Sequence, residues 1–221
     1  MTPPADPPGA GVAAWDERHA RRGAPGTPHA VVDAVTADLV PGRAVDLACG
    51  AGRHALLLAG RGWAVDAVDT SAEGLAVGGR AVGGDRVRWH RADAVTWPRA
   101  LAPGSADLVL VAFAMLPGVV TAAAGALAGG GHLLVVGHAA EDAGRPGTPR
   151  DVRLLHDVAS LADEARGAGL AVVRADVVGR GAGEERRHDA VLLARRPTPG
   201  PGAGAEGGAG QSSAEGTSAG S

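Results

Sequence analysis

The sequence predicts an α/β fold in which a doubly wound, mostly parallel sheet forms a single domain. Short apolar segments alternate with helical segments of roughly 10–15 residues, which is typical of parallel strands joined by crossover helices. A Gly-x-Gly turn follows the first apolar segment and opens a helix, and aspartates stand at or just after the ends of the first three. Because ligands of such sheets bind at the carboxyl ends of the strands, these observations also predict where the functional site lies.

Apolar patterning and turn residues set the bounds of the expected elements. Pro41-Gly42 ends the first of these helices, Ser71 caps the third, Gly129-Gly130-Gly131 closes the fourth and Gly169 ends the last. The last two strands are close enough in the chain to pair as an antiparallel hairpin. We expect helices over residues 29–39, 53–60, 71–82, 119–127 and 157–168, and strands over residues 44–48, 63–69, 86–91, 106–112, 132–137, 170–178 and 189–195.

The composition is that of a globular chain. Its 221 residues are 45% hydrophobic and 20% charged, and a net charge of −3 gives no reason to expect a nucleic-acid partner. All 21 basic residues are Arg, and Lys, Ile, Asn and Tyr are absent. Since the missing types share AT-rich codons, we interpret the bias as mutational, from a GC-rich bacterial genome. No apolar run reaches the roughly 18 residues of a membrane span, so we expect a cytoplasmic protein without a membrane partner, with a monomer favoured.

Both ends of the chain differ from its centre. Residues 1–11 form a Pro/Gly-rich leader that lacks the basic and apolar regions of a signal peptide. Residues 197–221 are almost entirely Gly, Ala, Pro, Ser and Thr. Such a segment buries too little apolar surface to offset the conformational entropy that it would lose on folding. We expect a flexible leader and a disordered tail, with a linker or binding tail as the alternative, around a domain at residues 12–196.

The most informative motif is the turn after the first strand, Ala44-Val45-Asp46-Leu47-Ala48-Cys49-Gly50-Ala51-Gly52-Arg53-His54-Ala55. Its glycines permit a tight turn and a close approach of backbone N–H groups to a ligand, at which the next helix points its N-terminus. Asp46 would repel a pyrophosphate but suits a positively charged ligand such as S-adenosylmethionine, which brings an ammonium and a sulfonium. Gly52→Val is therefore expected to abolish ligand binding while the fold is retained.

Two further aspartates follow the next strands. Asp69 lies 17 residues after Gly52, where an acidic residue accepts hydrogen bonds from ribose hydroxyls; a helix-capping role is the alternative. Asp93 can accept the adenine amino proton while the N–H of Ala94 reaches a ring nitrogen, although loop aspartates are common. Asp66 is interior to its strand, so we expect it away from the ligand edge.

With these residues in place, the chain resembles a class I S-adenosylmethionine-dependent methyltransferase, and more narrowly the small bacterial tellurite/thiopurine-resistance type. The resemblance covers nearly all of the chain except its two ends. It is carried by Trp15-Asp16-Glu17-Arg18, residues 46–53, Gly62-Trp63, Ala67-Val68-Asp69, Arg91-Ala92-Asp93, residues 107–111, residues 133–138 and Ala194-Arg195-Arg196-Pro197. It implies a seven-stranded, Rossmann-like sheet and a small-molecule methyl acceptor.

The resemblance also implies where the cofactor binds. The methionine part is expected over the glycine turn, the ribose at Asp69, the adenine near Asp93, and Trp15 over the cofactor, with simple packing as the alternative for Trp15. The implied cofactor-binding residues are Asp46, Ala48, Gly50, Gly52, Asp69, Thr70, Asp93, Ala94 and Trp15. The chain departs from the family at His19, where relatives carry Tyr, and at residues 113–117, where relatives often have an aromatic-x-His before the Pro.

The implied reaction is an in-line displacement of the sulfonium methyl group. Positioning and desolvation can carry most of the catalysis, and a base is needed only if the acceptor loses a proton. We predict that His138 is this base or an orienting residue, with a structural His as the alternative, and that His19 reaches the acceptor pocket. Arg53 and His54 are expected to cap or decorate the helix start, and Cys49 to pack. No Cys/His cluster is present, so no metal site is predicted.

Two other classes of protein fit part of the pattern. Residues 50–55 match the Gly-x-Gly-x-x-Gly/Ala motif of a nicotinamide-dependent oxidoreductase. Asp46, the roughly 40 residues before the turn and the lack of a separate substrate domain argue against that class. A non-catalytic binding protein with the methyltransferase fold is the second alternative, because the acceptor-side residues are changed and a fold alone does not decide function.

Overall fold

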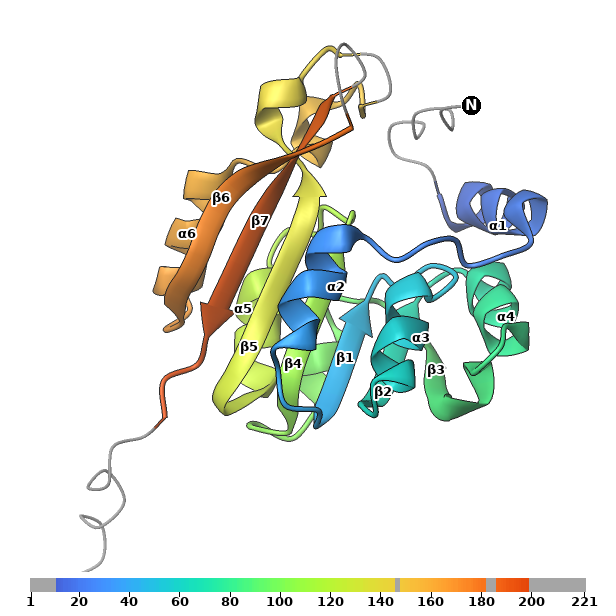
Figure 1. Cartoon of the computed structure of the whole chain (residues 1–221), viewed down its shortest axis with the longest axis horizontal. Coiled ribbons are helices and arrows are strands. Elements are labelled where there is room, and N and C mark those ends of the chain that lie inside the picture. The colour runs from blue at the N-terminus through green and yellow to red at the C-terminus, as the bar shows by residue number, and fades with distance from the viewer. Residues whose placement is uncertain (1–10, 146–147, 182–185, 199–221) are drawn as a thin grey trace, which may run out of the picture.

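The computed structural model describes residues 11–145, 148–181 and 186–198, which form one sheet of seven strands in the order β3-β2-β1-β4-β5-β7-β6 (Figure 1). Neighbouring strands from β3 to β5 are parallel, and β7 runs antiparallel to both β5 and β6. The predicted doubly wound fold and the predicted hairpin are therefore confirmed. The strands are β1 (Arg43–Leu47), β2 (Ala64–Asp69), β3 (Val87–Arg91), β4 (Ala106–Ala112), β5 (Leu127–His138), β6 (Ala171–Arg180) and β7 (Arg187–Arg195).

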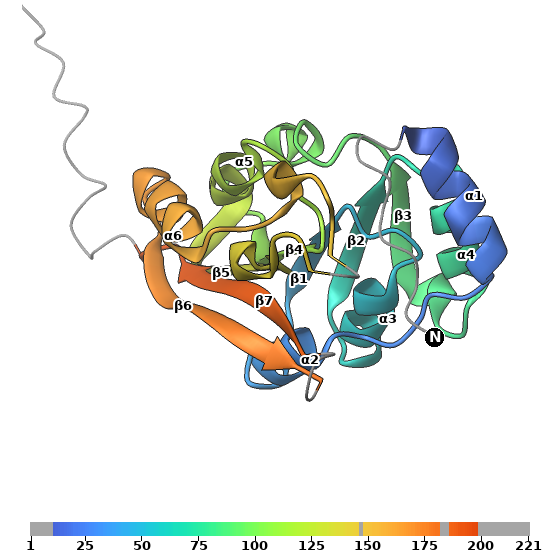
Figure 2. The same cartoon turned by 90° about the horizontal axis from the view of Figure 1, so that it is seen from above.

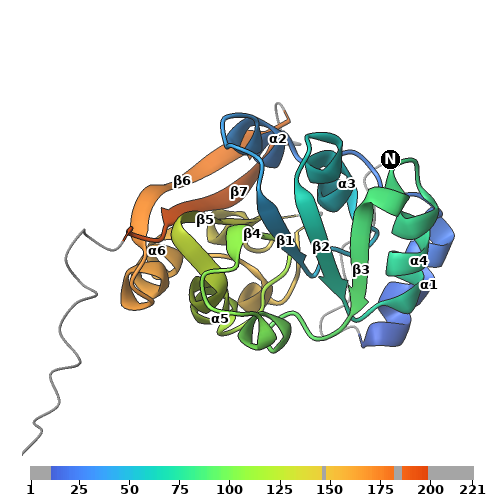
Figure 3. The same ribbon diagram turned by 90° about the horizontal axis from the view of Figure 1, so that it is seen from below.

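Helices cover both faces of the sheet. Figures 2 and 3 show α2 and α3 on one face and α5 and α6 on the other, with α1 packed on α4 at the β3 end. The helices are α1 (Val12–Arg22), α2 (Ala30–Ala37), α3 (Arg53–Gly60), α4 (Ala72–Arg80), α5 (Val119–Ala126) and α6 (Val158–Gly167), and short 3-10 turns are η1 (Gly84–Arg86), η2 (Trp97–Ala100), η3 (Ala140–Asp142) and η4 (Val152–Leu154). Among the described residues, no helix combines the length and apolarity that crossing a bilayer requires.

Alternation along the central strands builds two cores. Val109 and Val111 of β4 pack with the α5 and α6 side, whereas Leu108 and Leu110 pack with the α2 and α3 side. All four side chains are fully buried. A strand that is covered on both faces reads as a continuous apolar run, which is why residues 106–112 could be assigned from the sequence.

The start of β5 differs from the prediction. The glycines at 129–131 were expected to close the preceding helix, with the strand beginning at residue 132, but β5 already begins at Leu127. Its register against β4 shifts between Ala106 and Leu108, which marks an irregularity in the pairing. A Cβ on Gly131 would lie 2.9 Å from the carbonyl oxygen of Ala106. Gly131 therefore serves close backbone approach within the sheet and does not end the helix.

Most of the predicted leader and tail, residues 1–10 and 199–221, lies outside the described residues.

Candidate active site

The turn between β1 and α3 contains three residues in the left-handed conformation. Ala48, Gly50 and Gly52 have φ angles of 54°, 56° and 74°. The N–H of Gly52 donates to the carbonyl oxygen of Cys49 at 2.9 Å, which closes the turn just before α3 begins. Only glycine adopts this conformation without strain, so the Gly-x-Gly pattern sets the shape of the turn at the carboxyl end of β1.

Asp46, next to this turn, is a buried carboxylate with an unsatisfied oxygen. The residue is 1% exposed, and its Oδ2 atom has no hydrogen-bond partner. Burial raises the pKa of Asp46 to about 7, partly offset by the backbone N–H of Ala55 and by Arg53. A buried polar atom without a partner is uncommon and costly. The cation of a ligand would satisfy it, as predicted from the sequence.

Asp69, at the end of β2, is bound to the same turn. Its Oδ2 accepts the N–H of Gly50 at 2.7 Å, and its Oδ1 accepts the N–H of Ser71 at 2.7 Å. Asp69 thus braces the turn, while Ser71 itself caps α4. A carboxylate has about four acceptor positions, so these two bonds leave room for ribose hydroxyls. Thr70 beside it is exposed.

Asp93 and Ala94 follow β3 at the same edge of the sheet. Asp93 is exposed, and its Oδ1 accepts the N–H groups of Val95 and Thr96 at 3.1 and 2.8 Å. Ala94 is buried, with 6% of its surface exposed. The three predicted aspartates therefore lie at or just after the carboxyl ends of three neighbouring strands, β1, β2 and β3.

Helix α1 brings His19 to the glycine turn. Asp16 of this helix accepts hydrogen bonds from the Ser71 hydroxyl at 2.6 Å and from the Glu73 N–H at 3.1 Å. The His19 ring stacks on Trp15 and is so close to Gly50 that a Cβ there would lie 3.0 Å from it. His19 therefore lies beside the predicted cofactor turn, and its acceptor-side role stays a prediction.

The second glycine of the turn has a structural task that the sequence did not reveal. A Cβ on Gly52 would overlap the ring of Trp89 on β3, and so would a Cβ on Gly78 of α4. Trp89 thus fills the space that both glycines leave open, and its indole N–H donates to the carbonyl oxygen of Gly84 at 2.9 Å. Gly52→Val would displace this ring, so we expect the variant to lose stability as well as ligand binding.

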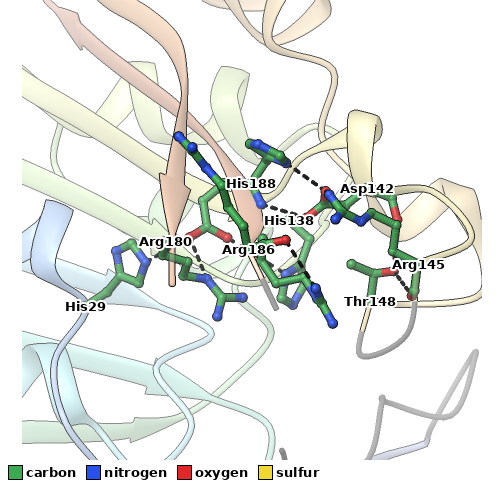
Figure 4. A network of polar contacts seen from close by, with 10 residues as sticks. His29, His138, Asp142, Arg145, Thr148, Arg180, Arg186 and His188 are labelled. Atoms are coloured by element: carbon green, nitrogen blue, oxygen red, sulfur yellow. Dashed lines mark hydrogen bonds and ion pairs between the residues drawn. The ribbon is translucent and has the colours of Figure 1, made fainter. Parts of the chain in front are cut away.

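His138 lies at the end of β5 within a group of polar side chains (Figure 4). Phe113, directly after β4, lies between two imidazoles, with ring centroids 5.1 Å from His29 and 5.0 Å from His138. Its φ angle of 59° is unusual for a bulky residue. Burial lowers the pKa of His138, so its neutral form is favoured.

Asp189 of β7 is the centre of this group, and the sequence reasoning missed it. The residue is fully buried and pairs in register with His138. Its Oδ2 lies 3.0 Å from His29 Nε2 and 2.8 Å from Arg180 Nε, and its Oδ1 faces His138 Nδ1 at 3.9 Å. His29 and Arg180 were missed with it. The only sequence feature that could have pointed to Asp189 is its place next to the apolar run Ala190-Val191-Leu192-Leu193-Ala194.

Arg53 and His54 were expected to cap or decorate the start of the helix. In the structure they instead contact residues of the His138 group. The Arg53 guanidinium lies 5.2 Å from the centroid of the Phe113 ring and interacts electrostatically with Asp46 and Asp189. His54 is 3% exposed, burial lowers its pKa to about 3, and its Nε2 accepts the His29 N–H at 3.2 Å. These two residues therefore connect the glycine turn with the His138 group.

Cys49 lies inside the turn. Burial raises the pKa of its thiol, which disfavours a thiolate. This environment agrees with the packing role expected for Cys49.

Comparisons with known proteins agree with this geometry. Residues 44–131 match a family model described as a methyltransferase domain. A search of curated proteins finds no match. Among solved structures, a protein from work on the conversion of a disulfide bond into a thioacetal group during echinomycin biosynthesis has a TM-score of 0.64 and 22% identity, with 84% of this chain and 92% of that chain covered.

Two further neighbours share the fold. The 1,6-didemethyltoxoflavin-N1-methyltransferase of Burkholderia thailandensis has a TM-score of 0.63 and 18% identity, covering 88% of this chain and 94% of that chain. TehB from Haemophilus influenzae has a TM-score of 0.62 and 17% identity, covering 76% of this chain and 62% of that chain.

The fold, the glycine turn and the match of residues 44–131 to a methyltransferase domain agree with the predicted class, that of class I S-adenosylmethionine-dependent methyltransferases. The likeness to TehB is one of fold, and the narrower resemblance seen in the sequence stays a prediction.

Proposed function

We propose that this protein transfers a methyl group from S-adenosylmethionine to a small-molecule acceptor. The observation that carries the proposal is the buried Asp46 carboxylate, whose unpartnered oxygen lies beside a left-handed glycine turn. A pyrophosphate at this position would meet a carboxylate, so a nicotinamide dinucleotide fits less well. The domain that performs the reaction spans residues 12–196.

Each part of the cofactor has a group that fits it. Asp46 would hold the ammonium, the backbone around Gly50 and Gly52 the methionine chain, Asp69 the ribose and Asp93 with Ala94 the adenine. When bound, S-adenosylmethionine supplies a methyl group on a sulfonium, which is an activated leaving group. The protein's own task is then to orient the acceptor, exclude water and accept a proton where the acceptor carries one.

His138 is the proposed proton acceptor. It lies at the carboxyl end of the fifth strand, and burial keeps its pKa low, so the neutral imidazole that a base requires is present at neutral pH. Fold neighbours are a methyltransferase crystallised with 1,6-didemethyltoxoflavin and one crystallised with geranyl diphosphate, and both compounds are small molecules. A small-molecule acceptor at the His138 end of the site is the corresponding proposal here.

We further propose a bacterial cytoplasmic enzyme that acts as a monomer and without a nucleic-acid partner. The net charge of −3 supports the last point, since nucleic-acid binding relies on positive charge.

Calorimetry with S-adenosylhomocysteine and NAD tests the proposal without a known acceptor. We expect the wild-type protein to bind S-adenosylhomocysteine and to give no measurable heat with NAD. Asp46→Asn should weaken S-adenosylhomocysteine binding at least tenfold, because the carboxylate charge is lost. Asp66→Asn is the matched control, since Asp66 is also a buried aspartate but its oxygens bind Arg43, Arg88 and His90.

Tighter binding of NAD, or equal effects of the two substitutions, would contradict the proposal. Cofactor binding without methyl transfer to any acceptor would favour the non-catalytic alternative.

A further inference from the structure

Two buried polar atoms face each other at the acceptor end of the site, and neither has a hydrogen-bond partner. They are Oδ1 of Asp189 and Nδ1 of His138, 3.9 Å apart. Unsatisfied buried polar atoms are rare and costly. Their gap exceeds hydrogen-bond length by less than 1 Å, so a small movement of the His138 ring would satisfy both atoms at once.

The other oxygen of Asp189 is already fixed. Nδ1 of His29 accepts the N–H of Val31 at 3.3 Å, which leaves Nε2 of His29 to carry the proton and donate it to Asp189. Arg180 donates to the same oxygen from the neighbouring strand. The carboxylate is therefore held by two donors and presents its free oxygen to His138.

We propose that Asp189 is the positioning residue for His138 and that the acceptor carries an O–H or N–H group which loses its proton during methyl transfer. Asp189 accepts the Nδ1–H of His138, and this bond leaves Nε2 unprotonated and directed to the acceptor. The inference rests on the proposed function, in which His138 accepts the proton. An acceptor that is already an anion would need neither His138 as a base nor Asp189 to position it.

The step balances in protons and electrons. Nε2 of His138 accepts the proton of the acceptor, and the electron pair of the broken bond stays on the acceptor atom. That atom forms the bond to the methyl carbon, while the electron pair of the carbon–sulfur bond returns to sulfur. One positive charge disappears at sulfur and one appears on His138, beside the Asp189 carboxylate, and the proton then leaves to solvent.

The charges around His138 come from several elements. Asp189 on β7 and Asp142 on η3 raise its pKa, whereas Arg180 on β6 and His29 before α2 lower it, and burial lowers it most. His156, after η4, also interacts with His138. Removal of the Asp189 charge should therefore lower the pKa of His138 further.

Nuclear magnetic resonance of the histidine side chains tests this arrangement directly. The full chain is labelled with nitrogen-15 in histidine and bound to S-adenosylhomocysteine, and His138→Gln assigns the signals. In the wild-type protein we expect neutral His138 to carry its proton on Nδ1. In Asp189→Asn we expect the pKa of His138 to fall by about one pH unit.

Asp142→Asn is the matched control. Asp142 is as buried as Asp189, but its oxygens accept the His188 backbone N–H at 2.6 Å and contact the His188 ring at 2.8 Å. This substitution should move the His188 signals most and the pKa of His138 less than Asp189→Asn does. A wild-type His138 with its proton on Nε2, or an unchanged pKa in Asp189→Asn, would overturn the inference. The position of the His138 proton in the wild-type protein tests the inference even if Asp189→Asn does not fold.

Calorimetry on the same samples separates this inference from the proposed function. Asp189→Asn should bind S-adenosylhomocysteine within about twofold of the wild-type affinity, because Asp189 lies on the acceptor side. A wild-type protein that fails to bind S-adenosylhomocysteine overturns the proposed function, whereas the proton on the wrong nitrogen overturns only the role of Asp189.

Discussion

The two halves of the sheet edge are built in different ways. At the ends of β1 and β2, Asp69 is held by backbone N–H groups of its own turn and of the glycine turn, 2 and 19 positions away. Near the ends of β4 and β5, Asp189 is held by side chains, and one of them, His29, is 160 positions away. The half around Asp46 and Asp69, where we propose that the cofactor binds (the cofactor half), thus depends on backbone geometry. The half around His138 and Asp189, where we propose that the acceptor binds, depends on side chains that the folded sheet brings together.

Two aspartates on neighbouring strands, Asp66 and Asp46, show how a buried carboxylate serves either stability or binding. Asp66 of β2 accepts hydrogen bonds from Arg43 and Arg88 and contacts His90, and these bonds lower its pKa to about 2 despite its burial. Asp46 of β1 has only a backbone N–H and the nearby Arg53, and burial raises its pKa to about 7. A buried carboxylate oxygen that accepts no hydrogen bond in the folded chain, like Oδ2 of Asp46, is one that a cationic ligand can satisfy.

Gly52→Val should give the largest effect, and it tests whether the cofactor half depends on backbone geometry alone. The added side chain would overlap Trp89 and impose strain at a φ angle of 74°. Overpacking costs about 1–3 kcal/mol and left-handed strain about 1–3 kcal/mol, so we expect a loss of several kcal/mol in the free energy of unfolding. Urea denaturation followed by circular dichroism measures it.

Gly62→Val is the control for strain. Its φ angle is 89°, but no atom lies within 4 Å of the added Cβ position, so only the strain cost applies. Equal losses for the two variants would show that the Trp89 contact contributes nothing.

Asp46→Asn and Asp66→Asn should change stability in opposite directions. The folded-state pKa of Asp46 is raised, so its ionisation opposes folding as the pH rises from about 4 to about 7. The folded-state pKa of Asp66 is lowered, so its contribution is present above about pH 4 and is lost as the pH falls toward 2.

At pH 8 we expect Asp46→Asn to stabilise the ligand-free protein by roughly 2–4 kcal/mol and Asp66→Asn to destabilise it by roughly 2 kcal/mol. Urea denaturation at pH 5 and pH 8 measures both, and the gain of Asp46→Asn should shrink at pH 5. A loss of stability in Asp46→Asn at pH 8 would show that the charge of Asp46 is compensated within the chain.

The same contrast explains how far the sequence could predict the molecule. The bounds of α3 and β4, the glycine turn and the three strand-end aspartates follow from local patterns. The early start of β5 did not, because it depends on the contact of Gly131 with the neighbouring strand. His19 depends on the docking of α1 through Asp16 and Ser71, which are 55 positions apart.

Asp189 is the clearest case of what local patterns miss. Nothing within ten residues of it distinguishes an aspartate that binds two distant side chains from one that simply begins an apolar strand. Its partners His29, Arg180 and His138 come together only when β7 inserts between β5 and β6.

Asp69→Ala tests the predicted ribose site and should weaken S-adenosylhomocysteine binding at least tenfold. A hydrogen bond to a charged group contributes about 1.5–3 kcal/mol, and the variant also loses the two backbone bonds that brace the turn. Asp69→Asn separates these effects, because its amide oxygen can still accept one N–H. Calorimetry measures the affinities, and an unchanged dissociation constant in Asp69→Ala would leave Asp69 with its bracing role alone.

Asp93→Ala should have the smallest effect, because Asp93 is exposed and its predicted bond to the adenine amino group competes with water. A bond of this kind contributes about 0.5–1.5 kcal/mol, so we expect S-adenosylhomocysteine to bind about two- to tenfold more weakly.

The variant also loses the bonds from Val95 and Thr96 to Oδ1, and a melting curve without ligand measures that structural part. The S-inosyl analogue, which carries a carbonyl in place of the amino group, completes the test. If Asp93 binds the amino group, the analogue binds both proteins equally weakly; if the wild-type protein prefers the analogue, the adenine lies elsewhere and only Asp46 and Asp69 define the cofactor half.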